Sequence, residues 1–583
     1  MRALYGGNAL LLFLVHRAVW LVALLVTSGH QVQGFVLPAT TERNVERSME
    51  LFLFRRFRRK LIQRNDGETS QEGQALDTSD VPALVTPAAP TDSSNTDDKE
   101  TQKHRRIPSP TKHANILIIG AGVSGLTAAL QAANSVSTAK VVVLEASPTV
   151  GGRVQSDFTQ DGFILDRGFA VFLDAYPVVQ QILDYETLGL KPLLPGALIK
   201  LPNRQRLARV SDPLRKPRDL IPALLAPIGK WHDKLRFVPL VWSIRTKSLA
   251  QLFAEPETTT QQALTRRWAF SDSMLQTFWE PFLEGVFLSP LDFQSSRMFT
   301  FVMKMFSEGS GCLPSGGMRA VSQQLWDKVV KAGAAVHTNQ TVESIYQSMN
   351  RSNGTCYFVE TEDGTCWQTD SLIIATDSLV AKNLLAHLDY VVSFKNLPPP
   401  VQRAVGCAYY SFKGTPPVAD PILILNGCGA AQQRNTRDYP INNILFPSAV
   451  NPSYAPDGYS LCSVAILSQA LEAYANDDSG LDAAVRRQLS TWFPEEHKSI
   501  QSEWKLERIY RIPNAQPGQL EGPYPANQNG GRRTDTYHGK PLPKNLYVCG
   551  DHMATASLNG AMESGLQAGK VAAERLYAKQ QAL

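Results

Sequence analysis

Three glycines at a fixed spacing follow a short apolar segment near residue 120. The segment Asn115–Ile119 is typical of a buried strand and runs directly into Gly120, Gly122 and Gly125, after which residues 126–133 form an alanine-rich helical pattern. In Gly-x-Gly-x-x-Gly the first glycine permits a tight turn, the second lets a pyrophosphate approach, and the third lets helix and strand pack closely. Because helix N-termini favour anions, the pattern predicts a pyrophosphate site there.

An acidic residue stands where such a site needs one. A second apolar segment, Lys140–Leu144, ends at Glu145, which lies 20 residues beyond Gly125. A carboxylate at that point can accept hydrogen bonds from both hydroxyls of an adenosine ribose. A lone glycine pattern can be a mere tight turn, but strand, glycines, helix, strand and acid in this order predict a dinucleotide site.

Further constellations indicate which dinucleotide would bind. Gly151-Gly152-Arg153 and Asp166-Arg167-Gly168-Phe169 follow soon after Glu145. Near the C-terminus, the apolar segment 545–549 leads to Gly550 and Asp551, and a small-residue helix start follows at 557–565. An acid after a strand suits a polyhydroxylated chain such as ribityl, and a Gly-Ala helix start suits a phosphate or a flavin ring oxygen. A nicotinamide protein has no need of this second constellation.

These residues resemble the flavin-containing amine oxidase and phytoene desaturase superfamily, which binds FAD. The resemblance covers roughly residues 114–583 and is strongest at both ends and at Leu313–Met318. It implies FAD, with Glu145 on the ribose, Arg153 on the phosphates and Asp551 on the ribityl chain. We expect this FAD to be non-covalent, because no residue has a context that suggests a linkage. The cofactor-binding residues that the resemblance implies are Gly120, Gly122, Gly125, Glu145, Gly152, Arg153, Gly168, Val342, Gly550, Asp551, Gly560 and Ala561.

The same resemblance implies an α/β fold of the glutathione-reductase type. In it, a Rossmann-like FAD-binding domain is combined with a discontinuous α+β substrate domain. The FAD-binding domain is expected at 114–195, 306–380 and 531–583, with Val342 and Ile345 as its adenine-side wall and Leu372–Thr376 as its closing strand. The substrate domain is expected at 196–305 and 381–530.

The first 113 residues differ in composition from the rest. Residues 1–34 combine Arg2 with apolar stretches at 9–15 and 18–26, which predicts a signal peptide cleaved before Phe35; an uncleaved membrane anchor is the alternative. Residues 35–113 start with a basic segment that includes 55–60 and continue as a linker of disordered composition. Together they resemble the bipartite plastid presequence of algae with secondary plastids. The basic cluster alone would also suit peripheral membrane association through an amphipathic helix, or a solvated charge run.

Charge and cysteine content exclude several classes of protein. The chain has 583 residues, enough for two domains, and its formal charge of +5 implies no global field for nucleic acid. Its seven cysteines are odd in number and scattered without Cys-x-x-Cys, which argues against a disulfide framework and against structural zinc. This usage fits a reducing stroma. The oligomeric state is not indicated.

The middle of the chain should recognise the substrate. The apolar spacing of residues 235–249 predicts a helix beyond Pro239, and the aromatic-rich segment 270–288 is either simple core or, as in this superfamily, lining of an apolar tunnel. Segments 405–412 and 507–513 predict strands over the flavin ring. No Ser–His–Asp set or metal cluster is recognisable, and the catalytic side chains are unknown.

The hypotheses for function differ in substrate. The strand resembling 403–412 has no lysine before its end, and no paired aromatic cage is identifiable, so two features common in amine oxidases are missing. The first hypothesis is therefore a plastid FAD oxidoreductase acting on an apolar isoprenoid or polyene, as a desaturase or isomerase-like enzyme. The alternatives are tetrapyrrole oxidation resembling protoporphyrinogen oxidase, amine oxidation, and a flavin-stabilised assembly protein without turnover.

Overall fold

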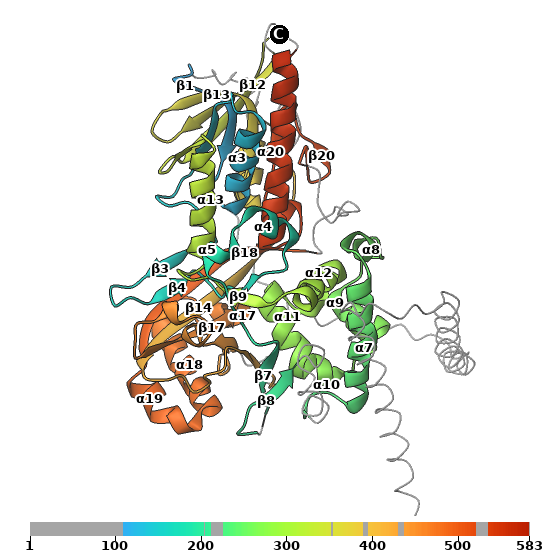
Figure 1. Cartoon of the computed structure of the whole chain (residues 1–583), viewed down its shortest axis with the longest axis vertical. Helices are drawn as coiled ribbons and strands as arrows, with labels where there is room; N and C mark the ends of the chain where they lie inside the picture. The colour runs from blue at the N-terminus through green and yellow to red at the C-terminus, as the bar shows by residue number, and fades with distance from the viewer. Residues whose placement is uncertain are drawn as a thin grey trace, which may run out of the picture. The chain divides into compact units, whose positions relative to one another are not determined.

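The structure is a computed structural model that describes residues 109–202, 204–211, 226–350, 354–388, 394–428, 437–519 and 534–581. The chain divides into two compact units, residues 1–102 and 103–583, and all described residues belong to the second (Figure 1). The predicted signal peptide and nearly all of the predicted targeting segment and linker lie outside the described residues. In the described part of the chain, no helix combines the length and apolar character needed to cross a bilayer.

The first large sheet has seven strands and carries the glycine-rich turn. Its order is β10-β2-β1-β13-β12-β11, with β21 paired to β13; β10, β2, β1, β13 and β21 run parallel, and β12 and β11 are antiparallel. The strands are β1 (Lys112–Ile119), β2 (Val141–Leu144), β10 (Ala335–His337), β11 (Val342–Asn350), β12 (Gly354–Thr361), β13 (Cys366–Ile374) and β21 (Leu546–Val548). The predicted closing strand 372–376 corresponds to the last three residues of β13, which ends at Ile374 and lies there between β1 and β21.

Both faces of this sheet are covered, which explains why its parallel strands read as continuous apolar runs. In β1, Ile116 and Ile118 pack into one core with helix residues, whereas Leu117 and Ile119 pack into another on the opposite face. The first core lies under α3 (Val123–Ser135), α13 (Arg319–Lys331) and α20 (Leu558–Gln581); the second includes α14 (Ser378–Ala386). In Figure 1, α3, α13 and α20 run side by side along the sheet.

The second large sheet draws its strands from other parts of the chain. Its order is β18-β14-β17-β16-β15-β7-β8, antiparallel except for the parallel pair β15 and β7. Its strands are β7 (Gly196–Lys200), β8 (Ala208–Ser211), β14 (Gln402–Lys413), β15 (Leu423–Asn426), β16 (Ile441–Leu445), β17 (Tyr459–Leu467) and β18 (Lys505–Pro517). The strands predicted at 405–412 and 507–513 are confirmed as the central parts of β14 and β18. Helices packed near it are α16 (Pro447–Val450), α17 (Ser468–Ala473), α18 (Asp478–Trp492) and α19 (His497–Ser502).

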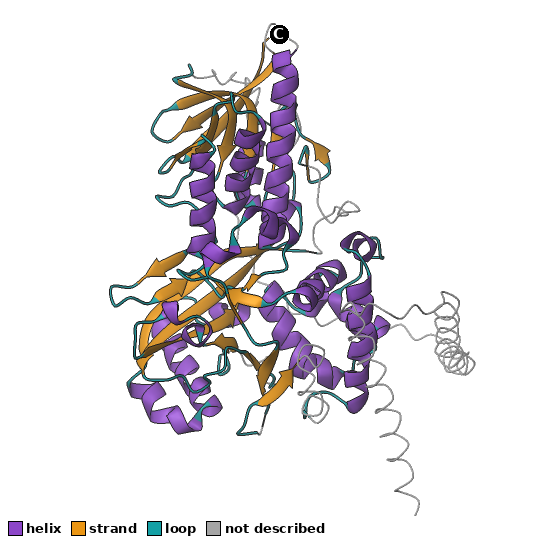
Figure 2. Ribbon diagram, in the orientation of Figure 1, coloured by secondary structure: helices purple, strands orange, loops and turns teal. Residues whose placement is uncertain are grey.

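The described residues between β8 and β9, 226–310, form a group of helices without strands (Figure 2). Its members are α7 (Trp231–Thr246), α8 (Leu249–Phe253), α9 (Thr260–Gln262), η2 (Ala263–Arg267), α10 (Asp272–Met274), η3 (Leu275–Trp279), α11 (Glu280–Phe287), η4 (Leu291–Phe293) and α12 (Ser296–Glu308). The helix predicted beyond Pro239 is confirmed up to Thr246, but α7 already begins at Trp231 and contains Pro239, so the part before the proline was not predicted. Proline removes one helix hydrogen bond, to the carbonyl of Leu235, but both residues are exposed and water can satisfy that carbonyl.

Short elements connect these parts. They are β3 (Ser156–Phe158), β4 (Ile164–Asp166), β5 (Phe172–Leu173), α4 (Pro177–Ile182), α5 (Tyr185–Leu188), β6 (Lys191–Pro192), β9 (Gly311–Leu313), η5 (Pro452–Tyr454), η6 (Pro494–Glu496), β19 (Thr536–Tyr537), β20 (Lys540–Pro541) and η7 (Asp551–Met553). All seven cysteines are free thiols. The predicted mixed α/β architecture is confirmed, with two sheets that each collect separated stretches of the chain; the predicted domain limits remain a prediction.

Candidate functional site

The turn between β1 and α3 is built as its glycines predict. Gly120 has φ 102°, a conformation that L side chains rarely adopt, and a Cβ on Gly125 would overlap the carbonyl oxygen of Gly120. At Gly122, the residue preceding α3, a Cβ would meet no protein atom within 4 Å. The protein thus leaves open space at the N-terminus of α3, where an anionic group fits.

Glu145 lies directly beside this turn. Its Oε2 accepts a hydrogen bond of 2.6 Å from the backbone N–H of Ala121, and its Oε1 accepts bonds from the backbone N–H and the hydroxyl of Ser147, at 3.0 and 2.7 Å. The backbone N–H of Gln340 donates to the carbonyl oxygen of Glu145 at 2.8 Å, two residues before β11 begins at Val342. The structure therefore brings Glu145, the glycine turn and the chain leading into Val342 together.

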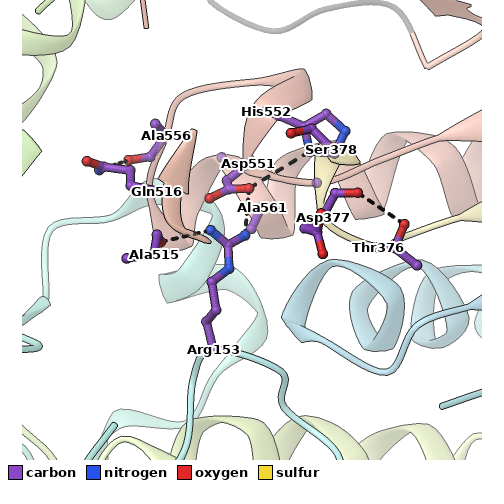
Figure 3. Close-up of polar contacts among 12 residues, drawn as sticks. Arg153, Thr376, Asp377, Ser378, Ala515, Gln516, Asp551, His552, Ala556 and Ala561 are labelled. Atoms are coloured by element: carbon purple, nitrogen blue, oxygen red, sulfur yellow. Dashed lines mark hydrogen bonds and ion pairs between the residues drawn. The ribbon is translucent and has the colours of Figure 1, made fainter. Parts of the chain in front are cut away.

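Arg153 joins the two ends of the chain. One guanidinium nitrogen lies 2.7 Å from Oδ1 of Asp551, and another donates to the carbonyl oxygen of Ala515 in β18 at 2.9 Å (Figure 3). The Asp551 carboxylate raises the pKa of Arg153. Burial alone would raise the pKa of Asp551, but the positive charge of Arg153 holds it below its ordinary value. Asp377, which adds a weaker attraction, lies opposite the guanidinium in Figure 3.

This ion pair was not expected from the sequence, which assigned Arg153 to phosphate and Asp551 to ribityl separately. The side chain of Arg153 remains 39% exposed, so it keeps room to meet a ligand, and its phosphate role remains a prediction. The neighbouring Gly151 forms an isolated bridge with Gly122, and a Cβ on Gly152 would lie 3.5 Å from the Cα of Gly122. The Gly-Gly-Arg segment is thus adjacent to the open turn.

The C-terminal constellation packs against the same turn. The hydroxyl of Ser564 in α20 both accepts from the N–H of Gly550 and donates to its carbonyl, each at 2.9 Å. At the start of α20, the N–H of Gly560 donates to the Ser557 hydroxyl at 3.1 Å, and the N–H of Ala561 donates to the Ser557 carbonyl at 3.0 Å. Gly565 lies so close to Ser124 of α3 that a Cβ would overlap its carbonyl oxygen. Gly550, Asp551, Gly560 and Ala561 are therefore gathered near the N-terminal fingerprint.

Gly168 lies in a different environment from the other predicted residues. A Cβ there would lie 2.9 Å from Cδ1 of Ile512 in β18, and its carbonyl oxygen accepts a 3.4 Å hydrogen bond from the Tyr409 hydroxyl in β14. It therefore lies where the first part of the chain meets the second sheet. The structure does not place it at the pyrophosphate turn.

Sequence reasoning missed the role of Asp166, although it singled out that segment. The carboxylate is buried and accepts hydrogen bonds from the Ser156 hydroxyl (2.6 Å), the Met318 backbone N–H (2.8 Å) and the Tyr454 hydroxyl (2.8 Å). Burial raises its pKa even though these bonds favour the charged form. Asp166 ties β4, the turn before α13 and η5 together. The acid was visible in the sequence, but its three partners are remote and were not.

Ala515 was missed for a different reason. It contributes a backbone carbonyl to Arg153 across 362 positions of the sequence. Every residue has a backbone carbonyl oxygen, so the amino-acid type at position 515 does not reveal this contact. Only the three-dimensional approach of β18 to the loop at Arg153 identifies it.

The aromatic segment 270–288 is largely core. Phe270, Trp279 and Phe287 are buried, and Phe237 of α7 lies 5.3 Å from the Trp279 ring in a stacked arrangement. A cavity of about 280 Å³ lies elsewhere in the helical group, between α8, η2 and α12, and none of the predicted FAD-binding residues lines it. The described residues contain no group of three or more His, Cys, Asp or Glu side chains that could hold a metal ion.

Comparison with known proteins identifies the family. The family described as flavin containing amine oxidoreductase matches residues 123–576, so this chain belongs to it, as the sequence predicted. Members are FAD-dependent oxidoreductases, and FAD is the cofactor that membership implies. The open turn at Gly122, the acid at Glu145 and the Arg153–Asp551 pair fit such a cofactor.

Individual relatives are distant. Coproporphyrinogen III oxidase from Bacillus subtilis (strain 168) is 25% identical over 407 residues, covering 63% of this chain and 79% of that protein. The chloroplastic/chromoplastic 15-cis-phytoene desaturase from Capsicum annuum is 21% identical over 498 residues, covering 81% of this chain and 79% of the relative. The structure of cyclohexylamine oxidase from Brevibacterium oxydans IH-35A superposes with a TM-score of 0.54 at 15% identity, covering 80% of this chain and 99% of that one. This likeness concerns the fold.

Proposed function

We propose that this protein is a plastid FAD oxidoreductase that transfers hydride to or from an apolar isoprenoid or polyene, in the manner of a desaturase or isomerase. The observation that carries the proposal is the similarity to chloroplastic phytoene desaturases over 81% of this chain, together with the flavin-family fold. Phe278 and Phe282, which are only partly buried, stack on one another and supply apolar surface in the helical part. In β14 the sole lysine is Lys413, its last residue, which disfavours an amine-oxidase arrangement.

In this proposal the residues of the chain bind and orient the cofactor. Glu145 holds the ribose, Arg153 the phosphates, and Asp551 the ribityl chain, while Gly560 and Ala561 present the start of α20. FAD, when bound, supplies the ring that accepts a hydride. The protein contributes placement and exclusion of water, for which no nucleophilic side chain is required.

The FAD is proposed to be non-covalently bound. Cys549 precedes Gly550 and is the one thiol in the constellation around Asp551. Burial raises the pKa of its thiol to about 12, so it stays protonated near neutral pH. A protonated, buried thiol is a poor candidate for a bond to a flavin ring.

Tetrapyrrole oxidation is the second candidate. The observation that favours it is the 25% identity with coproporphyrinogen III oxidase from Bacillus subtilis over 63% of this chain. A tetrapyrrole needs a broad pocket with cations for its propionates, whereas a polyene needs a long apolar one. The two candidates therefore predict different substrates for the same flavin.

The test is anaerobic reduction of the bound flavin, followed by its absorbance. We expect a polyene such as phytoene to reduce the bound flavin and coproporphyrinogen and amines to leave it oxidised, with free FAD under the same conditions as the control. Reduction by the porphyrinogen alone would establish the second candidate, and reduction by amines alone would refute both. If no compound reduces the flavin and a partner protein binds tightly, the protein is a flavin-stabilised assembly factor instead.

A further inference from the structure

Helix α7 carries apolar side chains on two opposite faces. Asp233, Phe237, Leu240 and Ile244 are spaced by three or four residues and face inward, where Leu240 and Ile244 are fully buried in the core. A second set with the same spacing lies opposite and is exposed, at Trp231 (68%), Leu235 (51%), Val238 (61%) and Trp242 (63%). Trp231 and Asp233 are two residues apart, about 200° around a helix of 3.6 residues per turn. A helix that is apolar on both faces normally has a second partner.

The exposed charged side chains of α7 and of Lys230 before it have one sign. Within α7, all of whose residues are described, the only acid is Asp233, and it is buried on the inner face. There its carboxylate accepts hydrogen bonds from the N–H of Lys230 and from Ser271, so its charge is not presented outward. Lys230 and Arg245 are exposed at the two ends of the helix, whereas the ammonium of Lys234 is partly buried and donates to the carbonyl oxygen of Ala226 at 2.5 Å. The outer surface therefore combines tryptophans with cations.

The size and chemistry of this face favour one kind of partner. Four side chains exposed by one half to two thirds amount to roughly 500 Å² in all, below the ~800 Å² per partner of a stable protein interface. A helix of this length lies about 24 Å along a surface. Tryptophan is enriched at the membrane–water boundary, and cations beside an apolar helix face attract anionic lipids. Figure 1 shows α7 at the outer edge of the helices α8 to α12.

We propose that α7 docks the protein on an anionic lipid bilayer, with Trp231, Leu235, Val238 and Trp242 inserted at the level of the headgroups and the outer acyl chains. Lys230 and Arg245 contact lipid phosphates. The inner face supports this docking, because Phe237 stacks on the buried Trp279 and fixes the rotation of the helix. This surface is independent of the substrate and of the redox reaction.

A local optical measurement tests insertion. The probe is vesicles of phosphatidylglycerol and phosphatidylcholine with brominated acyl chains, which quench tryptophans that reach them. Among the tryptophans described, Trp231 and Trp242 are the two that are more than half exposed. Full-length wild-type protein should be quenched, and the Trp231→Phe/Trp242→Phe variant, which keeps the face apolar, should lose that quenching. Any contribution of residues 1–108 is the same in both proteins, so equal quenching in the two would overturn the proposal.

Binding strength provides the second test. The triple variant Trp231→Gln/Val238→Gln/Trp242→Gln should partition to the same vesicles at least about tenfold more weakly than wild type, since three apolar side chains no longer leave water. Val330→Gln/Tyr577→Gln, which changes comparably exposed side chains elsewhere, is the matched control and should bind like wild type. Wild-type binding should weaken on purely zwitterionic vesicles and at high salt. Unchanged partitioning of the triple variant would refute docking through α7.

The rival occupant is a second copy of this chain. Light scattering without lipid distinguishes a dimer interface from a membrane-docking face. If α7 docks on a bilayer, the glutamine substitutions should not change the oligomeric state of the protein in solution. If wild type were a dimer and the triple variant a monomer, with equal vesicle binding, the face would be a dimer interface and the membrane proposal would be wrong. Retained secondary structure by circular dichroism establishes that the triple variant is folded.

Discussion

Asp166 is the residue whose role the structure defines most sharply. Its Oδ1 accepts from both Ser156 and Met318, and its Oδ2 accepts from Tyr454. Asp166→Ala leaves these buried donors unsatisfied and should destabilise the protein by about 2–5 kcal/mol. Asp166→Asn keeps one oxygen for Ser156 and Met318, and its amide can donate to the tyrosine oxygen, so it should cost about 1 kcal/mol or less. Thermal and urea unfolding measure the stabilities of wild type and of both variants. An asparagine variant as unstable as the alanine variant would contradict this prediction.

The same residue predicts a pH effect of defined sign. Burial raises the pKa of Asp166 above its ordinary value of 3.8, so the folded state binds this proton more tightly than the unfolded chain. Its contribution is therefore fully present below about pH 4 and is lost as the pH rises through the raised value. Asparagine does not titrate, so the stability of Asp166→Asn relative to wild type should improve between pH 4 and pH 7. A stability difference that stays constant over this range, or falls, would show that the carboxylate is stabilised as an anion.

Substitution of Glu145 should weaken the binding of the cofactor. Its carboxylate is already fixed by Ala121 and Ser147, so it is oriented before a ribose arrives. Glu145→Ala should weaken FAD binding by about 1.5–3 kcal/mol for each charge-assisted hydrogen bond removed. Glu145→Gln keeps one carbonyl oxygen, so its affinity for FAD should lie between the affinities of wild type and of the alanine variant. Titration of the flavin-free protein with FAD measures this; full occupancy of the alanine variant at limiting FAD would remove Glu145 from the site.

At the scale of elements, the packing of α20 on α3 holds the two halves of the site together. Gly565 and Gly569 lie against the carbonyl oxygens of Ser124 and Ala128, where side chains would overlap them. Gly565→Leu should separate the helices and lower both stability and flavin content. Ala578→Leu, at an exposed position of the same helix, is the control and should change neither.

Gly560 extends this argument to the cofactor. A Cβ there would overlap the carbonyl oxygen of Thr555, so a larger residue must displace the loop before α20. Gly560→Leu should therefore reduce flavin occupancy more than any single cysteine substitution, such as Cys312→Ala or Cys462→Ala, which should cost packing only, a few kcal/mol at most. Flavin absorbance per protein measures occupancy. A cysteine variant that lost more flavin than Gly560→Leu would contradict the assignment.

Local patterns were predictable from the sequence, whereas contacts between remote segments were not. The strand before Gly120 and the closing strand at 372–376 could be recognised because parallel buried strands are continuous apolar runs. The start of α7 could not be predicted, because a proline such as Pro239 usually marks a helix boundary. Here the helix continues through it because Pro239 lies on the solvent-facing side, where water can satisfy the carbonyl that loses its hydrogen bond. The pairing of Arg153 with Asp551 was also hidden, although each residue was singled out, because it depends on how the two ends of the chain meet.

At the scale of the whole molecule, the described fold and the N-terminal segment have separable tasks. The elements from β1 to α20 contain both large sheets and every predicted cofactor-binding residue. The compact unit that holds them starts at residue 103, after the predicted signal peptide and basic segment. We therefore expect the first 110 residues to determine the destination of the protein and to be dispensable for folding and for the flavin site.

A fusion experiment tests that destination. A reporter carrying residues 1–64 should enter plastids in an alga with secondary plastids, because these residues combine an apolar signal segment, Phe35 and a basic stretch. Phe35→Asp should still allow entry into the secretory pathway, which depends on the apolar segment, and should block the final import step. Fluorescence microscopy distinguishes the two compartments. Retention of the unmodified fusion in the secretory pathway would refute the plastid proposal, and plastid import of Phe35→Asp would show that the aromatic residue is not the signal.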